Sequence, residues 1–288
     1  MKVSKKAYAK INLCLNVFQK NERGFHNLDS LVTTIDLYDK ITVSKRKDSK
    51  VTLTVTGSNK DYVYNHVVEE DNAYRAVKAY MQETGCLGAD IVMQKNIPLS
   101  SGLGGSSTCA STTLLCMEEL YKMNADLPKL ANALGSDTNY LLKGGWARLT
   151  GRGDMVEYLP INKKLQFVAV FSEGGVNTKE CFSLFDSFPP ENIVYGNIDA
   201  LIQSLYGEEV AFSECKNSLQ EIACNINPNV KKAITALSAL SPEAVFMSGS
   251  GATVCALFSY EGLNKWAVEK LKAQGYDAEI LTTVIYKS

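Results

Sequence analysis

A glycine-rich stretch between two periodic segments limits the folds open to this chain more than any other feature. Residues 98–108 read Pro-Leu-Ser-Ser-Gly-Leu-Gly-Gly-Ser-Ser-Thr and follow the alternating apolar and polar residues of 89–94. After them, apolar side chains between 110 and 121 recur at spacings of four, three and four, which is typical of a helix. The sequence therefore predicts a strand, a glycine-rich loop and a helix in this order.

The residues of this loop suit a phosphate site, and they also suit a linker. Glycine lets the backbone approach a ligand closely and adopts positive φ. Hydroxyls where the helix begins can cap its free N–H groups, or those groups stay open to an anion that the helix dipole favours. The loop lacks the Gly-Lys-Ser/Thr of a Walker A loop and does not fit the dinucleotide fingerprint. These residues alone do not decide between a phosphate-binding loop and a flexible linker capped by serines.

Composition excludes several classes of partner. The 288 residues suffice for one large domain or two ordinary ones, and 45% hydrophobic residues supply a core. A net charge of −1 gives no positive electrostatic field that would attract nucleic acid or an anionic membrane. Eight cysteines without a C-x-x-C pair, and only two histidines, argue against a zinc site. Scattered cysteines are typical of reduced, buried thiols, so we expect a cytoplasmic protein.

The basic start of the chain predicts a strand and not a signal peptide. Apolar residues alternate with Asn12, Cys14 and Asn16, and no small-residue cleavage site follows. No segment approaches the roughly eighteen uninterrupted apolar residues of a membrane span. We therefore expect nothing to cross a membrane.

Periodicity predicts an N-terminal half that is mostly antiparallel sheet with one face in water. Its expected strands are 6–18, 31–37, 41–43, 51–55, 89–94 and 146–149. Its expected helices are one opened by 70–72 and stopped by Gly85, then 110–123 and 127–134.

The pattern of apolar and polar residues changes near residue 156. Beyond it we expect strands at 165–171, 244–247, 253–258 and 277–286, and helices at 178–186, 197–206, 215–224, 228–240 and 261–273. Strands and helices without strict βαβ alternation predict an α+β fold. We place a domain boundary near residue 155.

The order Pro-x-x-x-Gly-Leu-Gly-Gly-Ser-Ser resembles the phosphate loop of the GHMP kinase superfamily. Further stretches resemble one branch of it, the 4-diphosphocytidyl-2-C-methyl-D-erythritol kinases. They are 9–13 with 24–26, 70–72 with 75–76, 135–137 with 151–153, 247–252 and, more weakly, 175–178. Together they cover nearly the whole chain. The resemblance implies a two-domain GHMP kinase fold. Residues 1–155 would form an ATP-binding half like ribosomal protein S5 domain 2, and 156–288 a ferredoxin-like half.

The resemblance implies that Asp137 is the catalytic base and Lys10 a catalytic lysine. A carboxylate beside a lysine stays ionised and can accept the proton of a substrate hydroxyl. The ammonium offsets charge on the transferring phosphoryl group, with Mg²⁺ bridging the phosphates of ATP. On residue type alone, Lys10 also fits a surface lysine with its stem on an apolar strand. Asp137 likewise fits a helix cap or turn former.

The resemblance also implies two binding sets. ATP would contact Asn72, Pro98, Ser101, Gly102, Leu103, Gly104, Gly105, Ser106, Ser107 and Thr108. The substrate would contact Asn12, Phe25, His26, Thr178, Ser248, Gly249, Ser250 and Gly251.

The residue types in each binding set also fit purely structural roles. An aromatic face can stack on cytosine, and an imidazole can hydrogen-bond its edge. His26 also fits an ordinary satisfied polar residue, Asn72 the N-cap of its own helix, and 248–251 a simple tight turn.

Three departures from the family pattern bear on the activity. Phe25 stands where the family commonly has tyrosine, which removes a hydroxyl. Thr108 and Cys109 change the end of the loop, where the family commonly has a third glycine followed by Ser-Ser and Asn or Asp. Thr138 and Asn139 replace an apolar-proline pair. The alternatives are another small-molecule GHMP kinase, of homoserine or sugar type, or a nucleotide-binding paralogue with impaired catalysis.

The expected reaction is transfer of the γ-phosphoryl of ATP to the 2-hydroxyl of 4-diphosphocytidyl-2-C-methyl-D-erythritol, in non-mevalonate isoprenoid biosynthesis. The expected partner is this cytidine diphosphate-linked polyol. We expect no nucleic acid or membrane partner, and a monomer or weak homodimer.

Overall fold

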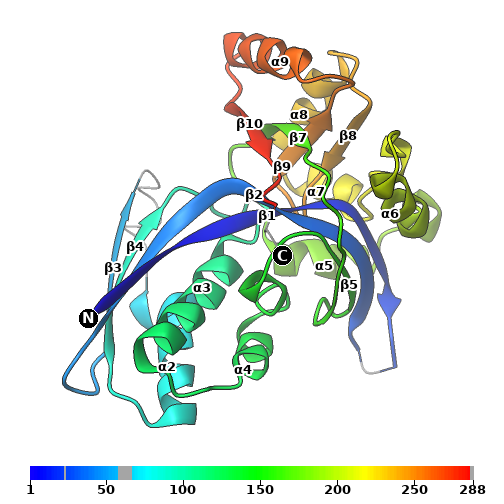
Figure 1. The fold of residues 1–288 in the computed structure, drawn as a ribbon. Coiled ribbons are helices and arrows are strands. Elements are labelled where there is room, and N and C mark those ends of the chain that lie inside the picture. The colour runs from blue at the N-terminus through cyan, green and yellow to red at the C-terminus, as the bar shows by residue number, and fades with distance from the viewer. Residues whose placement is uncertain (23, 58–66, 286–288) are drawn as a thin grey trace. The chain divides into compact units, whose positions relative to one another are not determined.

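A computed structural model describes residues 1–22, 24–57 and 67–285, which form two compact units. The first unit contains Met1–Ala9, Leu37–Leu99 and Gly104–Gly144, and the second contains Lys10–Asp36, Ser100–Leu103 and Gly145–Ser288. The long strands β1 (Lys2–Lys20) and β2 (His26–Lys45) each pass from one unit to the other (Figure 1). Each unit is therefore assembled from segments far apart in the sequence. The boundary near residue 155 concerns the two halves of the family fold and stays a prediction.

The first unit packs three helices on a small sheet (Figure 1). Strand β4 (Ala89–Lys95) pairs in parallel with β3 (Thr52–Gly57) and antiparallel with 40–45 of β2. The helices are α2 (Asn72–Thr84), α3 (Gly105–Tyr121) and α4 (Leu127–Leu134), with short 3₁₀ turns Val68–Glu70 and Tyr140–Leu142. Apolar side chains of the strands and helices share one core, among them Ile41, Ile91, Val77, Tyr80 and Leu114.

Local signals in the sequence explain where these helices begin and end. The Asp71 carboxylate accepts the Ala73 N–H at 2.6 Å and caps the start of α2. Gly85 ends that helix with φ 71°. Asp126 caps α4 by accepting the Lys129 N–H at 3.1 Å. These starts and stops confirm the two helices expected from the sequence.

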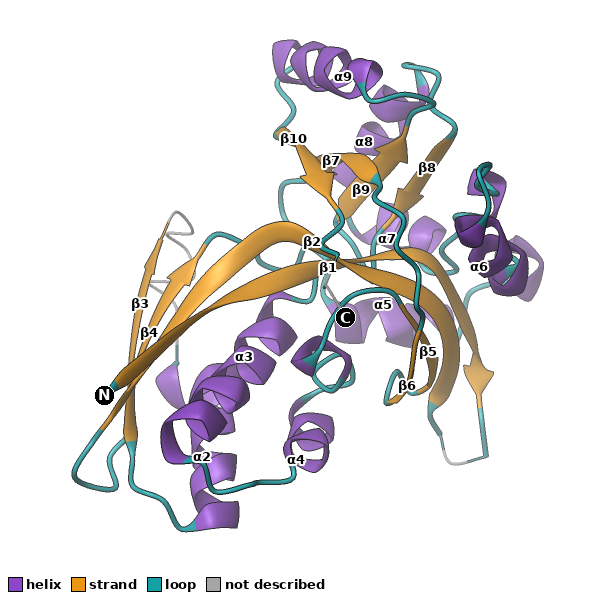
Figure 2. Ribbon diagram, viewed as in Figure 1, coloured by secondary structure: helices purple, strands orange, loops and turns teal. Residues whose placement is uncertain are grey.

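The second unit contains a four-stranded antiparallel sheet in the order β10-β7-β9-β8. Its strands are β7 (Gln166–Phe171), β8 (Ala244–Met247), β9 (Thr253–Leu257) and β10 (Ala278–Thr282). The helices are α5 (Thr178–Phe185), α6 (Ile198–Tyr206), α7 (Gln220–Ile226), α8 (Pro228–Ser238) and α9 (Gly262–Ala273), with 3₁₀ turns Pro190–Asn192 and Phe212–Glu214. Figure 2 shows α8 and α9 beside this sheet. The strand order and the helical crossovers are those of a ferredoxin-like unit.

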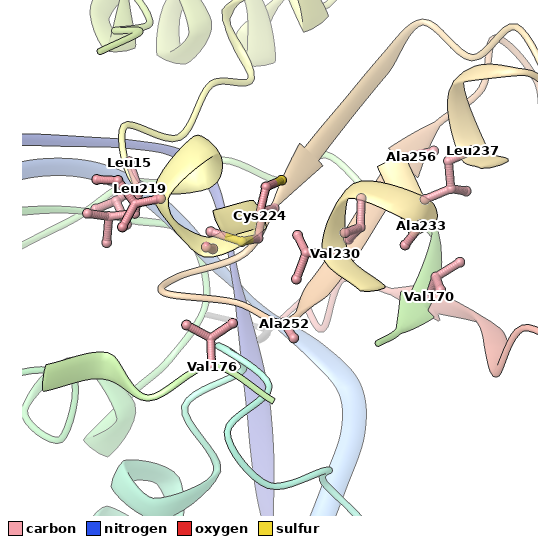
Figure 3. Packing of buried hydrophobic residues seen from close by; sticks show 14 of the residues in the cluster. Leu15, Val170, Val176, Leu219, Cys224, Val230, Ala233, Leu237, Ala252 and Ala256 are labelled. Carbon is pink, nitrogen blue, oxygen red and sulfur yellow. The ribbon is translucent and has the colours of Figure 1, made fainter. Parts of the chain in front are cut away.

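The second unit also holds a small sheet edge and a continuous apolar core. Residues 28–32 of β2 pair antiparallel with β5 (Ala147–Gly151), which pairs with β6 (Met155–Tyr158). Figure 3 shows the core, to which α8 contributes Val230, Ala233 and Leu237. Their spacing of three and four places these side chains on one face of α8.

Several expected boundaries are wrong. The expected strands 31–37 and 41–43 are one strand, β2, and β6 was not foreseen. The pairing of β3 with β4 is parallel. Helix α3 begins at Gly105 and ends at Tyr121, not at 110 and 123, because helical hydrogen bonds already start at the Gly104 carbonyl.

The expected helix 215–224 begins only at Gln220. The preceding segment instead pairs with β1, where the Leu15 N–H donates to the Lys216 carbonyl and Ser218 N–H donates to Leu15. Backbone groups committed to a strand cannot also form a helix. The end of the expected strand 277–286 includes residue 286, which lies outside the described residues.

All eight cysteines are unpaired, and seven of them are buried. In the described part of the chain, no helix is both long enough and apolar enough to span a membrane.

Candidate active site

The start of α3 is the centre of the candidate site in the first unit. Gly104 precedes the helix with φ 74° and has no side chain with which to cap the first turn. The first-turn N–H groups of a helix lack partners inside the helix, so this end carries partial positive charge. The Thr108 hydroxyl donates to the Tyr8 carbonyl at 2.8 Å and ties the helix to β1. The helix end therefore has the properties of an anion site.

Asn72 lies beside this helix end. Its side-chain amide donates to the Ser106 hydroxyl at 2.8 Å. Asp71, and not Asn72, caps α2, so the interpretation of Asn72 as an N-cap is wrong. The structure brings one predicted nucleotide contact, Asn72, to another, Ser106.

Asp137 lies in the turn that follows α4 and is half-buried. The Thr138 N–H donates to the Gly135 carbonyl at 3.1 Å, and Leu141 N–H donates to the Asp137 carbonyl at 3.1 Å. A Cβ on Gly135 would lie 3.5 Å from the Ser107 hydroxyl oxygen. The turn that carries Asp137 is therefore in contact with the first turn of α3.

A buried ion pair beneath this helix was not foreseen from the sequence. Lys95 at the end of β4 pairs with Asp39 of β2, and both side chains are buried. The other Asp39 oxygen accepts the N–H groups of Asn96 at 2.7 Å and Ile97 at 2.9 Å. Burial alone lowers the pKa of Lys95, but the adjacent Asp39 carboxylate raises this pKa above its ordinary value. Lys95 therefore stays charged inside the unit.

Cys109, one of the departures in the loop, belongs to the same cluster. Its thiol donates to Asp39 at 3.2 Å, and burial raises the pKa of the thiol. The side chain therefore stays protonated and lies in the core beneath the helix. The signal in the sequence was the isolated Asp39 and Lys95 in apolar strands, but spacing does not reveal that they pair.

In the second unit, Lys10 and Asn12 of β1 lie beside the middle of the glycine-rich loop. The Lys10 ammonium donates to the Asn12 side-chain oxygen at 2.5 Å, and its backbone N–H donates to the Leu103 carbonyl at 3.0 Å. Lys10 is only 4% exposed, so the interpretation of a surface lysine is wrong. The Ser248 hydroxyl accepts the Asn12 N–H at 3.2 Å and donates to the Gly102 carbonyl at 3.1 Å.

Two glycines allow this close packing. A Cβ on Gly102 would lie 2.1 Å from the Ser248 carbonyl oxygen, and one on Gly249 would lie 2.7 Å from the Gly102 oxygen. Their φ values are +76° and +57°. The Ser101 carbonyl accepts the Thr253 N–H at 3.0 Å on the same side. Residues 101–103 and 248–251 are thus held together.

Asn217 holds the second of these loops and was missed by the sequence analysis. Its amide nitrogen donates to the Met247 and Gly249 carbonyls, each at 2.7 Å. Because a peptide plane points its C=O and its N–H in opposite directions, the Ser250 N–H points away from Asn217. The Ser250 hydroxyl lies 2.8 Å from that of Thr178, another predicted substrate contact.

Phe25 and His26 have different surroundings. Phe25 is 46% exposed, and the Arg152 guanidinium carbon lies 4.4 Å from its ring centroid. The Nδ1 of His26 lies 2.8 Å from the Phe18 carbonyl oxygen, which only accepts, so Nδ1 carries a proton. Its Nε2 lies 3.1 Å from an Asp186 oxygen, and the Phe185 ring centroid is 5.3 Å from the imidazole centroid. Arg152 lies in the stretch 151–153 that resembles the family, whereas Asp186 and Phe185 had no signal in the sequence.

The predicted site residues are divided between the two units. The first unit holds Asn72, Pro98, Gly104, Gly105, Ser106, Ser107, Thr108 and Asp137, and the second holds the other predicted contacts and Lys10. The pairing of Lys10 with Asp137 joins residues of different units and stays a prediction. Among the described residues, no three His, Cys, Asp or Glu side chains cluster as metal ligands.

Comparison with known proteins defines the class. The model of the GHMP kinases N terminal domain matches residues 71–146, and that of the GHMP kinases C terminal domain matches 191–277. A crystal structure of 4-(cytidine 5'-diphospho)-2C-methyl-D-erythritol kinase has a TM-score of 0.81 and 29% identity, covering 99% of this chain and all of that one. A homoserine kinase from Cytophaga hutchinsonii has a TM-score of 0.74 at 18% identity, which shows the fold alone. The fold is that of a two-domain GHMP kinase, as expected.

Curated relatives narrow the class. A 4-diphosphocytidyl-2-C-methyl-D-erythritol kinase of Clostridium beijerinckii is 34% identical over 97% of this chain and 99% of its own length. One of Fusobacterium nucleatum is also 34% identical, over 85% of this chain and 84% of its own. The chain belongs to the 4-diphosphocytidyl-2-C-methyl-D-erythritol kinase family of the GHMP kinases.

Proposed function

We propose that this protein transfers the γ-phosphoryl group of ATP to the 2-hydroxyl of 4-diphosphocytidyl-2-C-methyl-D-erythritol. The observation that carries the proposal is the start of α3, where Asn72 and the turn of Asp137 meet a helix end whose N-cap residue is glycine. The names of the relatives supply the substrate. The family model supplies the reaction class, and the relatives named as this kinase favour it over the alternatives.

The residues at the helix end fit the phosphates of ATP. Backbone N–H groups of 104–107 would bind phosphate oxygens, and the small side chains there leave the backbone accessible. Asn72 beside Ser106 would contact the adenine. When bound, Mg²⁺ offsets phosphate charge, and the hydroxyls of Ser106 and Ser107 are the oxygen ligands that the helix end offers.

Asp137 and Lys10 divide the chemistry of the transfer. The Asp137 carboxylate would orient the 2-hydroxyl and accept its proton, and the Lys10 ammonium would stabilise charge on the phosphoryl group. Phosphoryl transfer depends mainly on such positioning and charge stabilisation.

The cytidine and diphosphate of the substrate would bind to the second unit. Phe25 offers an exposed ring to stack on cytosine. His26 would lie beside the base with its ring held in place, because Nδ1 donates to the Phe18 carbonyl and Nε2 faces Asp186. The Ser250 N–H and the Thr178 hydroxyl would hold phosphate oxygens. Ser248 would position this loop through its hydrogen bonds with Asn12 and Gly102.

The same proposal covers the organisation and setting of the protein. Its family halves are residues 1–155, which bind ATP, and 156–288, and it acts in the cytoplasm as a monomer or weak homodimer. The proposed role is non-mevalonate isoprenoid biosynthesis.

A coupled assay of ADP release tests the activity. The polyol substrate should give turnover, whereas homoserine and simple sugars should not, and CMP should compete with the polyol. Asp137→Ala should remove at least 100-fold of kcat, consistent with about 10²–10⁴-fold for general base catalysis. Turnover of homoserine alone, or calorimetric ATP binding without transfer to the polyol, would overturn the proposal.

A further inference from the structure

We propose that Ser30 is a positioning residue for Lys10 and that it acts through the Asn12 side chain. The inference rests on the proposed function, because Lys10 is a catalytic group only if the protein is a kinase. Ser30 belongs to β2, and Lys10 and Asn12 belong to β1. All three lie in the second unit.

A chain of hydrogen bonds joins these residues. The Lys10 ammonium donates to Asn12 Oδ1 at 2.5 Å, and Asn12 Nδ2 donates to the Ser30 hydroxyl at 2.8 Å. The Ser30 hydroxyl then donates to the Cys14 carbonyl at 2.7 Å. These hydrogen bonds therefore run from Lys10 and Asn12 on β1 to Ser30 on β2, and back to β1 at Cys14.

Each of these hydrogen bonds can have its donor on one side only. An ammonium has only donors, so Asn12 must turn its oxygen toward Lys10 and its NH₂ toward Ser30. The one proton of the Ser30 hydroxyl goes to the Cys14 carbonyl, so its lone pairs are free to accept from Asn12. Ser30 thus holds the amide in the orientation that Lys10 needs.

Burial makes this orientation costly to lose. Ser30 is fully buried, Asn12 is 5% exposed and Lys10 is 4% exposed. A buried donor that loses its partner is costly, because water does not replace the lost hydrogen bond easily. Without Ser30, the Asn12 amide would rotate to find another acceptor and would withdraw its oxygen from Lys10.

The backbone around Lys10 is held independently of Ser30. The Lys10 N–H donates to the Leu103 carbonyl and the Asn12 N–H donates to Ser248. A Cβ on Gly249 would lie 3.2 Å from the Lys10 ammonium nitrogen, which places the ammonium beside the 248–251 loop. Ser30 therefore controls the flexible end of Lys10 and not the strand that carries it.

The test compares steady-state kinetics of Ser30→Ala with those of Ser204→Ala as a matched control. The Ser204 hydroxyl also donates to a carbonyl, that of Leu201 at 2.7 Å, and accepts an N–H, that of Ala211 at 3.0 Å. We expect Ser30→Ala to lower kcat about 10- to 100-fold, the scale of a small misplacement of a reacting group. The KM for ATP should stay within about twofold, and Ser204→Ala should leave kcat unchanged.

A double-mutant cycle separates positioning from a merely structural role. If Ser30 acts through Asn12, adding Ser30→Ala to Asn12→Ala should change kcat by less than about twofold. Independent, multiplying losses would overturn the inference. If Ser30→Ala does not fold, Ser30→Cys gives the same comparison, since a thiol is a weak donor and acceptor.

The two proposals fail in different ways. Wild-type protein that transfers no phosphoryl group overturns the proposed function and the inference with it. Active wild type together with folded Ser30→Ala of normal kcat overturns the inference alone.

Discussion

Asp39 and Lys95 form a buried ion pair directly below the first turn of α3. A Cβ on Gly105 would lie 3.5 Å from the Lys95 ammonium nitrogen. The pair also holds the backbone at the end of β4, since Asp39 accepts the N–H groups of Asn96 and Ile97. The first turn of α3 thus lies on a buried, hydrogen-bonded ion pair.

Asp39→Asn should therefore destabilise the protein strongly. It leaves the Lys95 charge buried without its counterion, which costs about 3–5 kcal/mol. Urea unfolding measures the loss. Lys95→Met added to Asp39→Asn should restore part of the stability. Glu119→Gln, which breaks the exposed pair with Lys5, should cost less than about 1 kcal/mol. Equal losses for Asp39→Asn and Glu119→Gln would contradict the prediction.

Glu118 should make stability fall in acid. Burial opposes its ionisation, but hydrogen bonds from the Tyr80 hydroxyl at 2.8 Å and from the Ala125 and Asn124 N–H groups lower its pKa below 4.5. Because the pKa is lower in the folded state, this stability is present above pH 4.5 and is lost as the pH falls through the folded pKa.

Urea midpoints measured from pH 7 down to pH 3 test this. Glu118→Gln should flatten the acid decline relative to wild type, and the exposed neighbour Glu119→Gln should not. Parallel curves for wild type and Glu118→Gln would show that the carboxylate does not contribute.

Gly102→Ala should damage both stability and activity. Its Cβ would lie 2.1 Å from the Ser248 carbonyl oxygen at a φ of +76°. We expect a loss of about 1–3 kcal/mol from strain and at least a 10-fold drop in kcat/KM, because the clash pushes apart the two loops that flank Lys10.

Gly275→Ala is the matched control for this change. Gly275 also has a positive φ, +86°, but no atom lies within 4 Å of its Cβ position. It should cost some stability and leave kcat/KM unchanged. If the two variants lose equal activity, the contact with Ser248 is not what Gly102 provides.

Phe25→Leu should weaken binding of the cytidine substrate. Leucine keeps an apolar surface but loses the aromatic face, and base stacking is worth about 1–3 kcal/mol. The KM for the substrate and the inhibition constant for CMP should rise about 10-fold, with the KM for ATP unchanged. Tyr260→Leu, at another exposed aromatic residue, should alter none of these constants. An unchanged inhibition constant for CMP in Phe25→Leu would exclude Phe25 from base binding.

Local sequence determined much of the fold. Asp71 and Gly85 define α2 because a carboxylate caps N–H groups and glycine accepts a left-handed conformation. Alternation predicted β4 nearly residue for residue. The glycines of 102–105 and the serines after them predicted a loop entering a helix. These features depend on neighbours within a few residues, which a linear pattern displays.

Contacts between distant segments could not be predicted in this way. Segment 215–219 looks helical but forms an isolated bridge with β1, and only tertiary structure brings these two segments together. The same holds for Asp39 with Lys95, and for Ser30 with Asn12, which lie on different strands.

The sequence by itself determined the family and the glycine-rich loop that enters α3. Tertiary structure decided which of those residues are oriented, and by what: Asn12 by Ser30, the 248–251 loop by Asn217, and the end of β4 by Asp39. The physical reason is that capping and periodicity act over a few residues, whereas a buried polar group takes whichever partner the folded chain places within hydrogen-bonding distance.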